Sequence, residues 1–144
     1  MGLGGVAWAS GAQGWQHRHM DDDEPRDVDS LDTLLSDRLG LVVRLVANPG
    51  GRPAVLDCLH RYADRLDEEP GTEAFVINLD PDESDVVWLL EWFSGEQAMV
   101  DHRSSDAIAD MSEELATLLA APPGLVRMDP LRVHLQGVLI DSSL

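Results

Sequence analysis

The chain has 144 residues, and 44 % of them are hydrophobic, so one buried core and a single domain are predicted. The formal net charge of −17 excludes nucleic acid and anionic membrane surfaces as partners, because binding to these depends on clustered cationic side chains. No apolar run is long enough to span a bilayer, and no secretion signal is recognised. The lone Cys58 fits a reducing compartment, so we expect a cytoplasmic protein.

Residues 1–39 differ from the rest and are predicted to be an acidic arm, either irregular or partly helical. A segment rich in Gly and Ala precedes Met20, and the acidic block DDDEPRDVDS follows it. One hypothesis is therefore that translation begins at Met20. Residues 30–38 (SLDTLLSDR) are expected either to form a short helix or to dock on the domain. The domain itself is expected at residues 40–138, and a short tail at residues 139–144.

Apolar periodicity predicts a strand, a helix and a hairpin in the first half of the domain. Residues 41–48 alternate between two faces, and the turn PGGRP ends this strand. Apolar side chains recur at helical spacing over residues 55–66, and Pro70-Gly71 follows as a stop signal. Residues 72–80 and 86–93 are predicted strands joined by a short polar loop, which is the pattern of an antiparallel hairpin.

Two helices and a strand are predicted in the second half. Ser94, with a glutamine three residues on, resembles a capping box at the start of the first helix. Ser105 or Asp106 caps the second helix. A last strand is expected at roughly residues 126–135, broken by Asp129-Pro130, and this proline implies an edge position or a bulge. The order strand, helix, strand, strand, helix, strand predicts an α+β protein with the ferredoxin-like split βαβ fold and an antiparallel sheet.

The predicted sheet is apolar on both faces. The strand at 86–93 is polar only at Glu91, and the strand at 41–48 carries Val42 and Val46 on its second face. An antiparallel layer with helices on one side normally shows polar residues on the other. The predicted helices are too few to cover both faces, so we predict a homodimer packed sheet against sheet, with the arm as a further contributor.

Two ionisable residues on apolar elements are candidates for chemistry. Glu91 either pairs with Arg44 or another base near the strand end, or is an acid whose pKa an apolar pocket raises. His102 falls on the same side of its helix as Ala98 and Met99. It either interacts with the helix dipole or acts as a base near neutral pH. The sequence alone leaves these alternatives open.

Motifs for metal, dinucleotide or covalent chemistry are absent from the sequence. There is no HxxxH pair, HExxH or cysteine cluster, and no GxSxG. No glycine fingerprint lies between a strand and a helix. We therefore predict no metal site and no cofactor, and we expect Tyr62 and Phe75 to belong to the core.

Three short motifs occur in a recognisable order: EPGT at Glu69 to Thr72, the pair Glu91-Trp92, and His102 followed by Ser105-Asp106. With the strands around them, residues 41–133 resemble the antibiotic biosynthesis monooxygenase family. The resemblance implies a ferredoxin-like fold paired into a dimeric α/β barrel. It also implies an oxygenase that needs neither flavin, haem nor metal. In such an enzyme a base deprotonates a small aromatic quinol or anthrone, and the resulting anion reduces dioxygen inside a dry cavity.

The resemblance carries over to particular residues. The family's strand acid falls on Glu91 and its helix histidine on His102, which would be the base, with Glu91 orienting it or donating a hydrogen bond. The further substrate-binding candidates are polar or aromatic residues of the predicted strands, namely Trp92, Arg44, Asn78 and Phe75.

Two functions follow from the sequence. The first is a cofactor-independent monooxygenase acting on a small aromatic or polyketide-like substrate with dioxygen. The second is a non-catalytic dimeric domain that binds a small molecule or a partner protein, because one fold can host unrelated functions.

Overall fold

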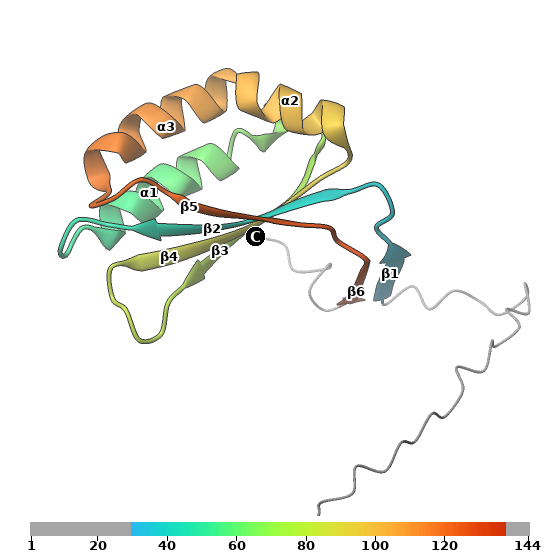
Figure 1. Ribbon diagram of the computed structural model, residues 1–144, viewed down its shortest axis with the longest axis horizontal. Coiled ribbons are helices and arrows are strands. Elements are labelled where there is room, and N and C mark those ends of the chain that lie inside the picture. The colour runs from blue at the N-terminus through green and yellow to red at the C-terminus, as the bar shows by residue number, and fades with distance from the viewer. Residues whose placement is uncertain (1–29, 138–144) are drawn as a thin grey trace, which may run out of the picture.

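A four-stranded antiparallel sheet forms the base of the domain, and helices cover one of its faces (Figure 1). The computed structural model describes residues 30–137. The strands lie in the order β3-β4-β2-β5, and each neighbouring pair is antiparallel. Their bounds are Leu39–Val46 for β2, Thr72–Leu79 for β3, Val86–Phe93 for β4 and Gly124–Met128 for β5.

The helices connect these strands on a single side of the sheet. They are α1 at Arg52–Ala63, α2 at Glu96–Ser104 and α3 at Asp106–Leu118, with the short 3-10 helix η1 at Leu66–Glu68 after α1. The element order and the strand order together confirm the predicted ferredoxin-like α+β fold. No helix within residues 30–137 is long and apolar enough to cross a membrane.

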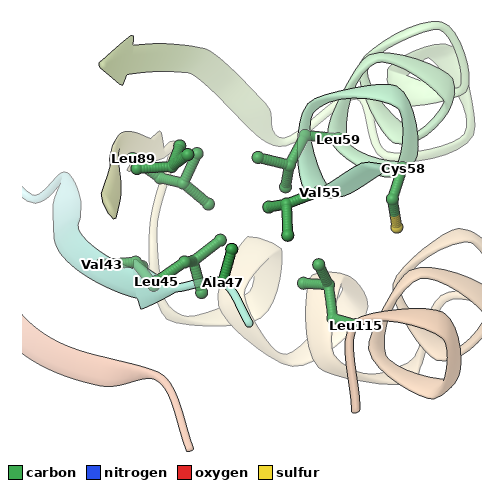
Figure 2. Close-up of a cluster of buried hydrophobic side chains, with 9 residues drawn as sticks. Val43, Leu45, Ala47, Val55, Cys58, Leu59, Leu89 and Leu115 are labelled. Carbon is green, nitrogen blue, oxygen red and sulfur yellow. The ribbon is translucent and has the colours of Figure 1, made fainter. Parts of the chain in front are cut away.

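The core lies between the sheet and the pair α1 and α3 (Figure 2). Alternate residues of β2 and β4 point toward the helices, as the period of two requires. Figure 2 shows Val43, Leu45 and Leu89 facing Val55 and Leu59 of α1. The buried cluster consists of Val43, Leu45, Ala47, Val55, Cys58, Leu59, Val87, Leu89 and Leu115.

Ser105 determines where α2 stops and α3 begins. Its backbone is extended, and its hydroxyl accepts a hydrogen bond from the Ile108 amide at 3.0 Å, which confirms the predicted cap. The capping box predicted at Ser94 is wrong. The N-cap of α2 is Gly95, and it forms no side-chain cap hydrogen bond.

The ends of the described chain form a separate two-stranded ribbon. Strand β1 (Ser30–Leu34) pairs antiparallel with β6 (Arg132–Gln136), so the helix considered for residues 30–38 is not formed there. The last strand expected at residues 126–135 consists of two strands, and the expected break at Asp129-Pro130 lies between them. The predictions for the arm before Ser30, for Met20 and for the tail at 139–144 lie outside the described residues.

Within residues 30–137, no helix covers the second face of the sheet (Figure 1). Apolar side chains lie on this face. Val42 lies between Leu90 on β4 and Val126 on β5, and Val76 of β3 extends this row beyond Leu90. Val76 is 42 % exposed and Val126 is 54 % exposed. We call this surface the open face.

Candidate functional site

A cavity of about 750 Å³ lies between the helix-covered face of the sheet and the helices α2 and α3. A volume of this size suits a small organic ligand. Polar side chains contribute at four positions, Glu91, His102, Arg103 and Ser112. The remaining lining residues are apolar: Leu41, Val43, Leu45, Leu89, Met99, Ile108, Met111, Leu115, Ala116, Leu119, Ala120, Ala121, Pro122, Pro123 and Leu125.

Glu91 faces this cavity from β4 and is only 3 % exposed. Its carboxyl forms no hydrogen bond or ion pair with another residue of the part that the structure describes. Burial, and second the nearby charge of Glu69, raise the pKa of Glu91 to about 7. The pairing considered with Arg44 is wrong, because Arg44 lies on the open face and binds Glu83 at 2.7 Å.

His102 reaches the cavity from α2 and is 6 % exposed. It shares the buried side of the helix with Ala98 and Met99, as predicted. Its Nδ1 lies 2.7 Å from Oε1 of Glu69 and 3.0 Å from the hydroxyl of Tyr62. The two cavity residues singled out from the sequence therefore line one cavity.

The carboxylate of Glu69 is the centre of a buried hydrogen-bond network. Besides His102, its Oε1 accepts hydrogen bonds from the hydroxyls of Tyr62 and Thr72, each at 3.2 Å. Its Oε2 accepts a hydrogen bond from Ser105 at 3.0 Å. Such donors compensate an ionised carboxylate for the water it loses on burial. Burial and the Glu69 charge in turn raise the pKa of Tyr62, so its hydroxyl stays a donor.

The loop that carries Glu69 depends on a close approach at Gly71. A Cβ at Gly71 would lie 2.5 Å from the Cβ of Ala98, so only glycine lets this loop pack against α2. The Thr72 amide donates to the Glu69 carbonyl at 2.9 Å, and the Ser94 amide donates to the Gly71 carbonyl at 2.8 Å. These contacts hold Glu69 under His102.

The network determines which nitrogen of His102 is available for chemistry. If Nδ1 carries the proton and donates it to Glu69, the lone pair of the neutral ring is on Nε2. Within residues 30–137, every fully buried side-chain nitrogen or oxygen has a hydrogen-bond partner. Nε2 of His102 has no hydrogen-bond partner among these residues, so this atom is not fully buried. His102 lines the cavity, and we infer that Nε2 is accessible from it. The arrangement can therefore accept a proton from a bound molecule and stabilise the resulting imidazolium through Glu69.

The other predicted site residues lie elsewhere. Arg44, Asn78 and Trp92, which were expected beside the cavity, belong to the open face because each is offset by one residue from a helix-facing position. The Asn78 amide donates to the Trp88 carbonyl at 3.3 Å. Phe75 faces the helices but does not line the cavity, and its ring packs edge-on against Tyr62 at 5.1 Å between centroids.

Four residues of this site were not predicted from the sequence: Glu69, Tyr62, Arg103 and Ser105. Ser105 was predicted as a helix cap, but not as a hydrogen-bond donor to Glu69. Tyr62 is a core residue, as predicted, but its hydroxyl also joins the network. Glu69 was noticed only as part of the EPGT motif. The signal for its burial is weak, because Glu69 is the last residue of the acidic run DEE and is easily interpreted as one more solvated charge.

No group of three or more His, Cys, Asp or Glu within residues 30–137 is arranged to hold a metal ion. The polar residues that line the cavity are a glutamate, a histidine, an arginine and a serine.

The fold and this cavity define a ferredoxin-like domain with an acid and a base on apolar walls. Residues 38–114, more than half of the chain, match the family model described as antibiotic biosynthesis monooxygenase. The chain belongs to this family. Among curated proteins, none matches this chain.

Several solved structures share the fold. A candidate antibiotic biosynthesis monooxygenase from Caulobacter crescentus has 18 % identity and a TM-score of 0.62, over 67 % of this chain and 92 % of that one. Rv0793 from Mycobacterium tuberculosis has 20 % identity and a TM-score of 0.60, over 65 % and 95 %. A protein of unknown function from Nitrosomonas europaea has 29 % identity and a TM-score of 0.56, over 64 % and 87 %.

The stability of the variant Glu91→Gln relative to the wild type is expected to increase as the pH rises, because the wild type loses stability. The wild-type carboxyl titrates near 7 in the fold and near 4.5 in the unfolded chain, so unfolding releases a proton between these values and stability falls as the pH rises through them. Ionising Glu91 in the fold costs on the order of 3 kcal/mol. Denaturant unfolding at about pH 5 and about pH 8.5 measures the difference.

Glu113→Gln, on the exposed side of α3, is the matched control and should show no such trend. A stability difference between Glu91→Gln and wild type that is equal at both pH values contradicts the raised pKa.

Proposed function

We propose that the protein is a cofactor-independent monooxygenase that oxidises a small aromatic quinol or anthrone-type compound with dioxygen. The observation that carries the proposal is the pairing of His102 with the buried Glu69 carboxylate at the wall of an apolar cavity. Membership of the antibiotic biosynthesis monooxygenase family supports the reaction class.

His102 is the base in the proposed reaction. Its Nε2 removes a proton from the activated C–H or O–H group of the substrate, and Glu69 stabilises the imidazolium that forms. The electron-rich substrate anion then transfers electrons to dioxygen, and the two combine to a peroxide anion. This anion takes the proton back from the His102 imidazolium, which gives the hydroperoxide and restores the neutral base. Loss of water leaves the carbonyl product, so one oxygen atom enters the substrate and the other leaves as water.

Glu91 is the hydrogen-bond donor in this scheme. With its pKa raised to about 7, it is protonated in a large share of molecules at neutral pH. A protonated carboxyl in an apolar cavity can donate to the substrate oxygen on which negative charge develops. In this scheme Glu91 donates a hydrogen bond to the substrate, and His102 accepts a proton from it.

The open face supports a homodimer in the same proposal. Val42, Leu90 and Val126 form an apolar row without a helix over it, and exposed patches of this kind typically meet a partner. A second copy placed sheet against sheet would cover the row and also shelter Trp88 and Trp92, which lie on the same face.

The variant His102→Ala is expected to lower kcat/KM by roughly 10²–10⁴-fold, because it removes the proton acceptor. Oxygen uptake by metal-depleted protein, measured over a panel of quinols and anthrones, is the readout. His60→Ala, an exposed histidine of α1, is the control and should keep full activity. Absence of turnover over the panel, or equal turnover in His102→Ala, would overturn the proposal and favour a non-catalytic binding domain.

The variant Val126→Arg is expected to convert the dimer to a monomer, because it places a charge in the apolar row of the open face. Light scattering during gel filtration measures the mass of each species. Val100→Arg is a matched control, since Val100 on α2 has the same exposure of 54 % as Val126 but lies on the helical side. A monomeric wild type, or a Val126→Arg variant that remains dimeric, contradicts the assembly.

A further inference from the structure

We propose that the cavity takes an organic anion, in which an apolar aromatic body fills the cavity and a single carboxylate-like group binds Arg103. The inference deepens the proposed function, because it names the substrate class of the same cavity. It rests on Arg103, whose position and lack of partners distinguish it from the other arginines of the described chain.

The other arginines are held by partners. Arg38, Arg44, Arg61, Arg65 and Arg127 each form an ion pair with a carboxylate. Arg52 donates to the backbone carbonyls of Asp80 and Glu83, and Arg132 also interacts. Arg103 has neither an ion pair nor a hydrogen bond within residues 30–137, although the chain contains 27 acidic residues.

The charge of the whole chain makes this guanidinium significant. A net charge of −17 repels anions at long range, so an anionic ligand needs a local cation to bind. Arg103 is the cation that the cavity lining offers, apart from His102 when it is protonated. A planar guanidinium binds a carboxylate through two parallel hydrogen bonds, which also fixes the orientation of the ligand.

The position of Arg103 fits the chemistry of the site. It follows His102 directly on α2, and both residues line the same cavity. An anion held at Arg103 would keep the apolar body of the ligand close to His102 and Glu91. The walls formed by Met111 and Leu115 of α3 and by Val43 of β2 would then cover that body. Ser112 also lines the cavity, and a serine hydroxyl can donate a further hydrogen bond to a ligand.

The test compares two probes of one shape, 1-naphthoate and its neutral amide, 1-naphthamide, by isothermal titration calorimetry with the full-length protein at about pH 6. We expect naphthoate to bind wild type about 3- to 10-fold more tightly than the amide, because Arg103 is exposed and solvent screens its ion pair. Arg103→Gln should remove this preference and leave the affinity for the amide within about twofold. Added salt should weaken only the binding of naphthoate to wild type.

Arg127→Gln is the matched control, since Arg127 is an exposed arginine outside the cavity, and it should keep the preference. Naphthoate that binds wild type no more tightly than the amide, or Arg103→Gln with undiminished preference, overturns the inference. Because binding is measured without turnover, a failure of oxygen uptake would overturn the proposed function alone. Loss of the anion preference would overturn this inference alone.

Discussion

The buried carboxylate of Glu69 joins four elements of the fold at one point. It accepts hydrogen bonds from Tyr62 of α1, from Thr72 at the start of β3 and from Ser105 at the cap of α3, and its Oε1 lies 2.7 Å from Nδ1 of His102 on α2. A carboxylate in such a place is tolerated only when donors replace its water, so these partners are needed for the fold as well as for the site. Stability and the orientation of His102 are therefore coupled through one residue.

Consecutive side chains of β4 face opposite sides of the sheet, and the two sides differ in character. Glu91 points to the helices and the cavity, whereas Trp92 beside it points to the open face. The side toward the helices combines an acid with the histidine and apolar walls. The other side offers an apolar surface for a second subunit in the assembly that we propose. A single strand thus contributes to both the chemistry and the proposed interface.

The sequence predicted most of the fold because the signals for its elements are local. The bounds of the strand at 86–93 were confirmed, as were the buried side of α2 and the cap at Ser105. Glu69 could not be found in this way, since its partners come from positions up to 36 residues away and acidic neighbours hide its burial. Ribbon β1-β6 also depends on pairing between distant segments.

The error over Arg44, Asn78 and Trp92 has a different cause. Trp92 was transferred from the family motif together with its neighbour Glu91, and Arg44 and Asn78 were chosen as polar positions on the strands. Adjacent residues of a strand, however, face opposite sides. Strand alternation alone separates Glu91 from Trp92. The same alternation separates Arg44 from Val43, which does line the cavity.

The central claim is that Glu69 holds the proton of neutral His102 on Nδ1, so that Nε2 is the base. Nuclear magnetic resonance of ¹⁵N-histidine-labelled protein reports the tautomer directly, and His102→Gln assigns the signal. The account predicts that neutral His102 carries its proton on Nδ1 and that Nε2 has the chemical shift of an unprotonated nitrogen. A neutral His102 protonated on Nε2 would contradict it.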